Sequence, residues 1–238
     1  MLSEKMIVSD ESPMPLRIKF RKAGMLRYIS HLDLQRTFAK VITRSGIPAW
    51  YTKGFNPHAK LVFALPLSVG TSSETEFLDI RLREYMSPDE VRERLNSVLT
   101  DELTALEVYA PKYKFTDIGF AEYEMEMITE GADAALAEKI NDLFASPSLM
   151  MLKHTKSGEK EVDIIPLIKS FKAEYSSERG SVLMRARLSA ISTDYLGPDM
   201  LITAMKERLG VLSGDIMRER YTILRTGVYL LDGKTLFE

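Results

Sequence analysis

The chain of 238 residues is 45% hydrophobic and 28% charged with a net charge of −2, a composition typical of a globular protein with one large or two smaller domains. It holds no cysteine, which excludes disulfides and thiolate-ligated zinc or iron–sulfur sites and indicates a reducing, cytoplasmic setting. No apolar run approaches the roughly 20 residues that cross a bilayer, so no membrane association is expected.

The first half of the chain alternates predicted strands and helices. Apolar and basic residues alternate over residues 16–24, which predicts a half-buried strand with a basic outer face. Ser30 and Asp33 form a capping box for a helix that closes at Gly46. The elements expected after it are strands over 60–67 and 74–82, a helix over 87–99 and a strand over 103–111. The order is β-α-β-β-α-β.

The second half repeats this order. The expected elements are a strand over 121–129, a helix over 133–146, a hairpin around Lys156–Glu159, a short helix or irregular piece at Ile165–Ile168, a strand over 181–190, a helix over 197–210 and a strand over 217–231 that can bend at Gly227. The pattern predicts an α+β fold of two tandem ferredoxin-like (βαββαβ) units, a tandem duplication. The N-terminal domain is expected over residues 15–111 and the C-terminal domain over 120–232.

Charge is distributed unevenly along the chain. Residues 15–73 hold ten Lys or Arg and a single acid, Asp33, whereas residues 74–142 hold eighteen acids and seven bases. A segment this one-sided is a candidate anion-binding surface. The alternative is that its charges lie on solvated faces and are neutralised by the acidic segment folding beside it.

Residues 27–82 carry a recognisable signature, Gly54-Phe55-Asn56-Pro57-His58 leading into Pro66-Leu67-Ser68-Val69-Gly70. With it, the chain resembles an uncharacterised bacterial family described as radical-SAM-associated. The resemblance implies association with radical SAM proteins or RNA metabolism. It does not imply that this chain binds an iron–sulfur cluster or cobalamin, and no cofactor is expected. Separately, the acidic segment 74–142 is a candidate docking face for a basic protein partner. Tandem ferredoxin-like units are also similar in architecture to RNA-processing endoribonucleases of CRISPR systems, although "RTGVYLLDGKT" near the C-terminus lacks their glycine-rich loop.

The basic segment combines cations with aromatic residues, the pairing that proteins use for RNA phosphates and unstacked bases. Two rows are expected, one along the strand (Arg17, Lys19, Arg21) and one at helical spacing (Arg36, Lys40, Arg44). The candidate nucleic-acid-binding residues are Arg17, Lys19, Arg21, Arg27, Tyr28, Arg36, Lys40, Arg44, Tyr51, Lys53, Phe55, Asn56, His58 and Lys60.

Three functions are open at this point. The first is an RNA-binding accessory protein acting with a radical SAM or RNA-modification and maturation system. The second is a metal-independent endoribonuclease in which His31 and His58 serve as base and acid, with Lys53 stabilising the transition state. The third is a protein-interaction module without nucleic acid. A metal site from His31, Asp33 and His58 is disfavoured, because residues two apart on a helix point in different directions.

Overall fold

A computed structural model describes residues 13–155, 158–215 and 217–238. The fold is of the mixed α+β class, as predicted. The chain forms two compact units: the first ends at Phe115 and includes Glu238, and the second spans Thr116–Phe237. Within the described residues, no helix is long and apolar enough to cross a membrane.

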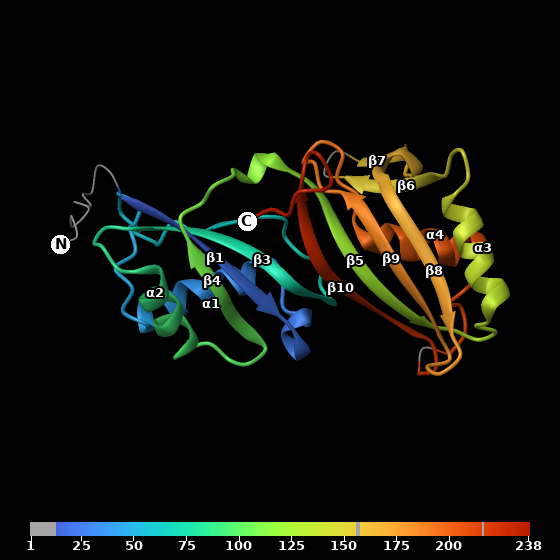
Figure 1. The fold of residues 1–238 in the computed structure, drawn as a ribbon, viewed down its shortest axis with the longest axis horizontal. Coiled ribbons are helices and arrows are strands. Elements are labelled where there is room, and N and C mark those ends of the chain that lie inside the picture. Colours follow the sequence, from blue (N-terminus) through green and yellow to red (C-terminus); the bar gives the residue numbers. More distant parts are fainter. Residues whose placement is uncertain (1–12, 156–157, 216) are drawn as a thin grey trace. The chain divides into compact units, whose positions relative to one another are not determined.

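The first unit is a sheet with two helices (Figure 1). Its elements are β1 (Met14–Lys22), the 3-10 helix η1 (Gly24–Tyr28), α1 (His31–Arg44), β2 (Val62–Phe63), β3 (Thr71–Leu82), α2 (Pro88–Asn96) and β4 (Leu103–Tyr109). Strands β4, β1, β3 and β2 lie side by side in this order, and each neighbouring pair is antiparallel.

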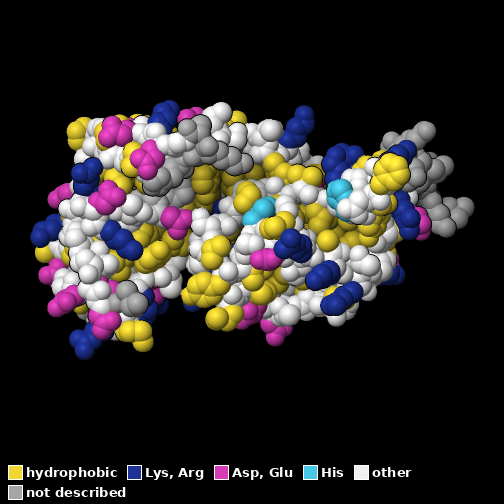
Figure 2. Space-filling view, turned by 180° about the vertical axis from the view of Figure 1, so that it is seen from behind, with side chains coloured by type: hydrophobic (Ala, Val, Ile, Leu, Met, Phe, Trp, Pro, Cys, Tyr) yellow, Lys and Arg dark blue, Asp and Glu magenta, His cyan; other side chains and the backbone are white. Residues whose placement is uncertain are grey.

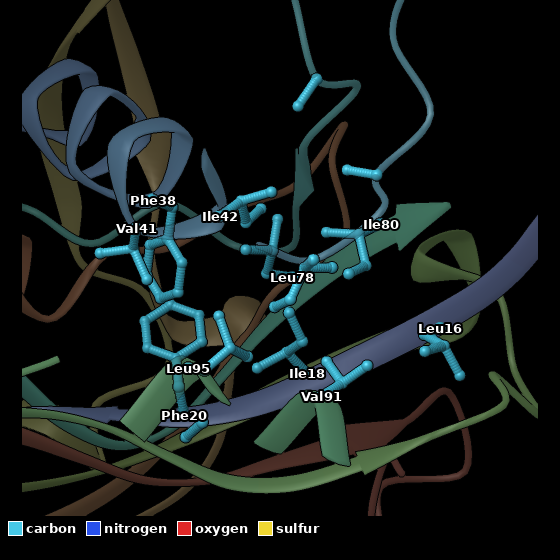
Figure 3. Packing of buried hydrophobic residues seen from close by; sticks show 14 of the residues in the cluster. Leu16, Ile18, Phe20, Phe38, Val41, Ile42, Leu78, Ile80, Val91 and Leu95 are labelled. Carbon is cyan, nitrogen blue, oxygen red and sulfur yellow. The ribbon is translucent and has the colours of Figure 1, made fainter. Parts of the chain in front are cut away.

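The core of the first unit lies between the sheet and its two helices (Figure 3). The alternation in β1 turns Leu16, Ile18 and Phe20 to the same side, where they are fully buried. Phe38 of α1 packs against Phe20 with ring centroids 4.8 Å apart, and Leu95 of α2 is fully buried in the same cluster. The apolar periodicity of strand and helix therefore determines which faces meet.

Both helices of the first unit begin at the capping residues predicted from the sequence. The Ser30 hydroxyl oxygen accepts a hydrogen bond from the Asp33 amide at 3.1 Å, and that of Ser87 accepts one from the Glu90 amide at 3.3 Å. The Ser30 hydroxyl also donates to the Asp33 carboxylate at 2.7 Å, and this bond is the main reason that the pKa of Asp33 is lowered.

The second unit is built from a four-stranded antiparallel sheet, two helices and a separate hairpin (Figure 1). Its elements are β5 (Ile118–Ile128), α3 (Ala134–Phe144), β6 (Met150–Thr155), β7 (Gly158–Asp163), the 3-10 helix η3 (Ile165–Leu167), β8 (Ile168–Ser176), β9 (Ser181–Ser189), α4 (Pro198–Leu209) and β10 (Arg220–Leu230). The strand order is β10-β5-β9-β8. Strands β6 and β7 form the predicted hairpin, of which residues 156 and 157 lie outside the described part.

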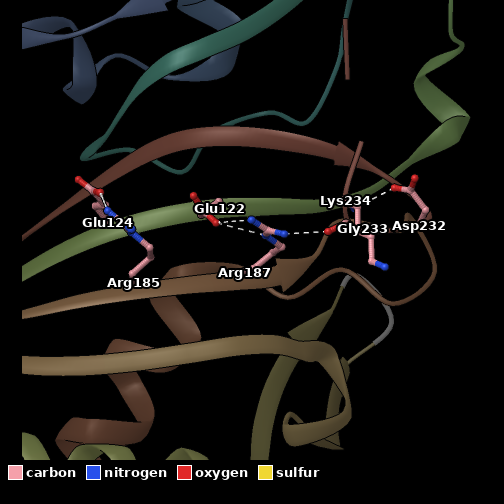
Figure 4. Close-up of polar contacts among 7 residues, drawn as sticks. All are labelled: Glu122, Glu124, Arg185, Arg187, Asp232, Gly233 and Lys234. Atoms are coloured by element: carbon pink, nitrogen blue, oxygen red, sulfur yellow. Dashed lines mark hydrogen bonds and ion pairs between the residues drawn. The ribbon is translucent and has the colours of Figure 1, made fainter. Parts of the chain in front are cut away.

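Paired charges line the polar side of β5 and β9 in this sheet (Figure 4). Arg187 donates to Glu122 at 2.6 Å and Arg185 to Glu124 at 2.5 Å. Arg187 also lies 3.8 Å above the ring of Tyr229 and donates to the Gly233 carbonyl at 2.7 Å. Because each of these bases already has a carboxylate partner, this face offers few charges to a ligand.

Some elements differ from the prediction. The strand expected over 60–67 is reduced to Val62–Phe63, because the ladder to β3 ends before Pro66, a residue without an amide donor. Strand β8 and helix η1 were not predicted, since neither shows a clear periodicity. The expected bend at Gly227 is confirmed as a break in the register between β10 and β5.

Candidate nucleic-acid interface

Helix α1 presents the predicted row of cations. Arg36, Lys40 and Arg44 are all exposed and recur every four residues, so they lie along one stripe of the helix. Arg36 is 3.4 Å from the exposed carboxylate of Asp33, a weak surface pair. Lys40 and Arg44 form no ion pair with any described residue. Two cations of this row are therefore available to an anionic ligand.

The segment after α1, residues 50–60, folds into a hairpin loop. The amide of Thr52 donates to the His58 carbonyl at 2.9 Å, and the amide of Lys60 donates to the Trp50 carbonyl at 3.3 Å. Tyr51 and Ala59 form a bridge between these two bonds. This short ladder holds the tip, residues 53–57, away from the core, and we call residues 50–60 the hairpin loop.

The tip of the hairpin loop exposes an aromatic side chain. Phe55 has a relative exposure of 112%, so no part of its ring is covered by the protein. Lys53, Asn56 and Lys60 are also exposed. Gly54 has φ +130°, a conformation that L side chains rarely adopt, which explains the glycine before Phe55.

His58 stabilises the hairpin loop from within. Its Nδ1 lies 3.2 Å from the Thr52 hydroxyl and 3.1 Å from the Asn56 carbonyl oxygen, and its amide donates to the Thr52 hydroxyl at 3.2 Å. These bonds connect the two sides of the loop just below its tip. His58 therefore positions the tip, and its partner is Thr52, which was not among the predicted residues. The two residues are six positions apart, a spacing that carries no recognisable signal.

The hairpin loop is attached to α1. The hydroxyl groups of Tyr51 and Thr43 lie 3.4 Å apart. Thr43 is three residues from Lys40 and adjacent to Arg44, so Tyr51 lies beside the end of the helix that carries the two available cations. On the face shown in Figure 2, the first unit carries several Lys and Arg side chains with few carboxylates among them. Helix α1 and the hairpin loop thus form one basic surface.

The predicted basic row along β1 does not offer available cations to this surface as the row on α1 does. The prediction that Arg17 lies on an exposed face is wrong: its side chain is 1% exposed and bound to Asp79 on β3. Lys19 pairs with Glu107 at 2.8 Å, and Arg21 donates to the Asp101 carbonyl at 2.7 Å. For Arg17 and Lys19, the neighbouring strands supply acids at the facing positions, which is the neutralisation that the charge distribution left open. Arg21 has a backbone carbonyl as its partner instead.

Arg27 and Tyr28 lie in η1, before α1. The Arg27 guanidinium is 4.8 Å from the centre of the Tyr28 ring, and the Arg27 carbonyl accepts the Gly70 amide at 2.8 Å. Tyr28 is 52% exposed. No contact among the described residues connects this pair to the hairpin loop, so the two remain separate candidates.

His31 is the first residue of α1 and is partly buried. Its Nε2 lies 3.0 Å from the Gln35 side-chain amide nitrogen. The centres of the His31 and Phe63 rings are 5.2 Å apart, and the two rings are nearly perpendicular. Burial and the charge of Lys22 lower the pKa of His31, which keeps the imidazole neutral. No hydrogen bond or ring contact within the described ranges joins His31 to His58.

A metal centre also lacks support. Among the described residues, no group of three or more His, Asp or Glu side chains is arranged to hold an ion. The set of His31, Asp33 and His58, which the sequence disfavours as a metal site, is not among such groups. Asp33 instead bonds to Ser30 and Arg36.

The fold and this surface define an α+β protein of two compact units whose first unit carries a basic surface with a protruding aromatic residue. The chain belongs to the bacterial family described as "Uncharacterized protein conserved in bacteria (DUF2344)", which matches residues 15–198. A search of the curated proteins found no match.

Among solved structures, the chain is similar to one in "Crystal Structure of a Cbf5-Nop10-Gar1 Complex". The two are 12% identical with a TM-score of 0.49, and the match covers 90% of this chain and 48% of that chain. This chain therefore spans about half the length of the solved chain.

Proposed function

We propose that this protein binds RNA through helix α1 and the hairpin loop of its first unit. The observation that carries the proposal is the attachment of the hairpin loop to α1 through Tyr51 and Thr43, beside Lys40 and Arg44, which have no ion-pair partner among the described residues. Cations without carboxylate partners interact favourably with phosphates, because counterions of the nucleic acid are released on binding. Side chains of Arg and Lys on phosphates position the ligand.

The role we propose is that of an accessory protein for a radical SAM or RNA-modification and maturation system. Its support is the resemblance of residues 54–58 and 66–70 to the signature of the radical-SAM-associated family. Recovery of a radical SAM protein with the native chain, from cells treated with and without ribonuclease, tests this role. Loss of the partner after ribonuclease would indicate that RNA bridges the two proteins.

We further propose that each unit is of the ferredoxin-like class. When strands are counted within each unit, both sheets have the order fourth, first, third, second, namely β4-β1-β3-β2 and β10-β5-β9-β8. Both also have the element order β-α-β-β-α-β if the β6–β7 hairpin is left aside. This assignment describes the scaffold and carries no function by itself.

The binding proposal is tested by fluorescence anisotropy of a labelled RNA at several salt concentrations. Lys40→Glu should weaken binding severalfold and reduce the slope of log affinity against log salt. The matched control is Lys139→Glu, since Lys139 is an exposed helical lysine of the second unit and the reversal changes net charge equally. Equal effects of the two variants, or no salt-dependent binding by the wild type, would overturn the proposal.

A further inference from the structure

We infer that the ligand of this surface is single-stranded RNA, with one unpaired base stacked on Phe55. This inference rests on the proposed RNA binding and names the class of RNA. It starts from the ring of Phe55, which is fully exposed at the tip of a hairpin loop whose base is held by backbone bonds. A large apolar ring presented in this way is suited to contact a partner, because burying it removes apolar surface from water.

The charges around the ring favour a nucleic acid as that partner. Lys53 lies two residues before Phe55, Lys60 lies at the base of the loop, and both are exposed. Beyond Tyr51, the row on α1 continues with Arg44 and Lys40, which are about 6 Å apart along the helix axis at 1.5 Å per residue. A chain of phosphates can follow this row while a base turns toward the aromatic ring, the arrangement found in single-strand binding.

Duplex RNA does not fit the tip. In a paired helix both faces of each base are covered by stacked neighbours, and the major groove is too deep and narrow for side chains to read. Phe55 could therefore contribute only to an unpaired segment. Lys40 and Arg44 would still contact the phosphates of a duplex, so the duplex should bind through charge alone.

A membrane surface is the competing occupant. Proteins that insert into the interface use a broad apolar face above a basic one. The tip offers a single apolar ring among Lys53, Asn56 and Pro57, and the nearby Tyr51 hydroxyl is engaged with Thr43. The observations therefore favour a base over an acyl chain.

The test compares a labelled single-stranded RNA of about 12 nucleotides, within the usual site size, with the same RNA annealed to its complement. Phe55→Ala should weaken binding of the single strand about 5- to 100-fold and leave binding of the duplex unchanged. Tyr85→Ala, which removes an exposed aromatic ring outside the candidate set, should change neither. The fluorescence of Trp50, the single tryptophan of the chain and part of the loop, provides a second readout.

The outcomes distinguish failure of base stacking on Phe55 from failure of RNA binding itself. If both RNAs bind equally and Phe55→Ala changes neither, RNA binding stands and the inference is overturned. If neither RNA binds, the proposed function fails as well. Binding to vesicles that contain anionic lipid, lost in Phe55→Ala and without any binding of RNA, would assign the loop to a membrane surface.

Discussion

Arg17 and Asp79 face each other directly across strands β1 and β3, and the guanidinium binds both carboxylate oxygens, at 2.7 and 2.9 Å. The arginine is 1% exposed, whereas the side chain of its partner is 28% exposed. The Arg17 guanidinium also lies 4.4 Å from the centre of the Phe115 ring. The arginine of this pair therefore belongs to the interior of the first unit and not to the basic surface formed by α1 and the hairpin loop.

Asp79→Asn should destabilise the first unit by about 3 kcal/mol, because it removes the negative charge that binds the buried guanidinium through two hydrogen bonds. Urea unfolding followed by Trp50 fluorescence measures the change, since the single tryptophan lies in this unit. Glu107→Gln is the control: it removes the partner of Lys19 in a pair whose side chains are 25% and 58% exposed, and it should cost less than about 1 kcal/mol. Equal losses of unfolding free energy in both variants would show that the Arg17–Asp79 pair stabilises the unit no more than the Lys19–Glu107 pair.

The stability of the first unit should fall as the pH falls below the ordinary His31 pKa of 6.5. Burial and Lys22 lower the pKa of His31 in the folded state, so the unfolded chain takes up the proton first and is favoured in acid. The stability is fully present above pH 6.5 and is lost progressively toward the lower pKa of the folded state.

His31→Gln should remove this part of the pH dependence, because glutamine is of similar polarity and does not titrate. Urea unfolding of both proteins between about pH 7.5 and 5 makes the comparison. If the free energy of unfolding changed with pH in the same way in the wild type and the variant, His31 would not be the group responsible. Because the pH dependence is taken as a difference between them, other titrating groups cancel.

Thr52→Val should loosen the tip of the hairpin loop, because the hydroxyl that contacts His58 is lost while the shape of the side chain is kept. Faster hydrogen exchange at residues 53–57 is expected, together with a severalfold loss of RNA affinity. The free energy of unfolding should fall by about 1 kcal/mol or less. Thr203→Val, whose hydroxyl donates within α4, is the control and should affect neither exchange at the tip nor binding. Unchanged exchange in Thr52→Val would show that His58 does not depend on this contact.

Much of the fold could be predicted because it depends on local chemistry. The caps at Ser30 and Ser87 and the alternation in β1 act over a few residues, so their signals survive in the sequence. The predicted length of strand β2 was too long, because its actual length is set by pairing with β3 and by Pro66, not by its apolar residues. The row on α1 was predicted for the same reason as the helix, since spacing of four places residues on one stripe.

The sequence by itself determined the α+β class, the positions of the helices, the uneven charge and the unusual loop around Phe55. Only the tertiary structure decided which of the basic residues remain available. Arg17 is 62 residues from Asp79, and only the register of β1 on β3 brings them together. Lys40 and Arg44 meet no described carboxylate, and the loop lies beside them through Tyr51 and Thr43. Ion pairing depends on the distance between two charges in space. For residues on strands from distant parts of the chain, the number of residues between them does not predict that distance.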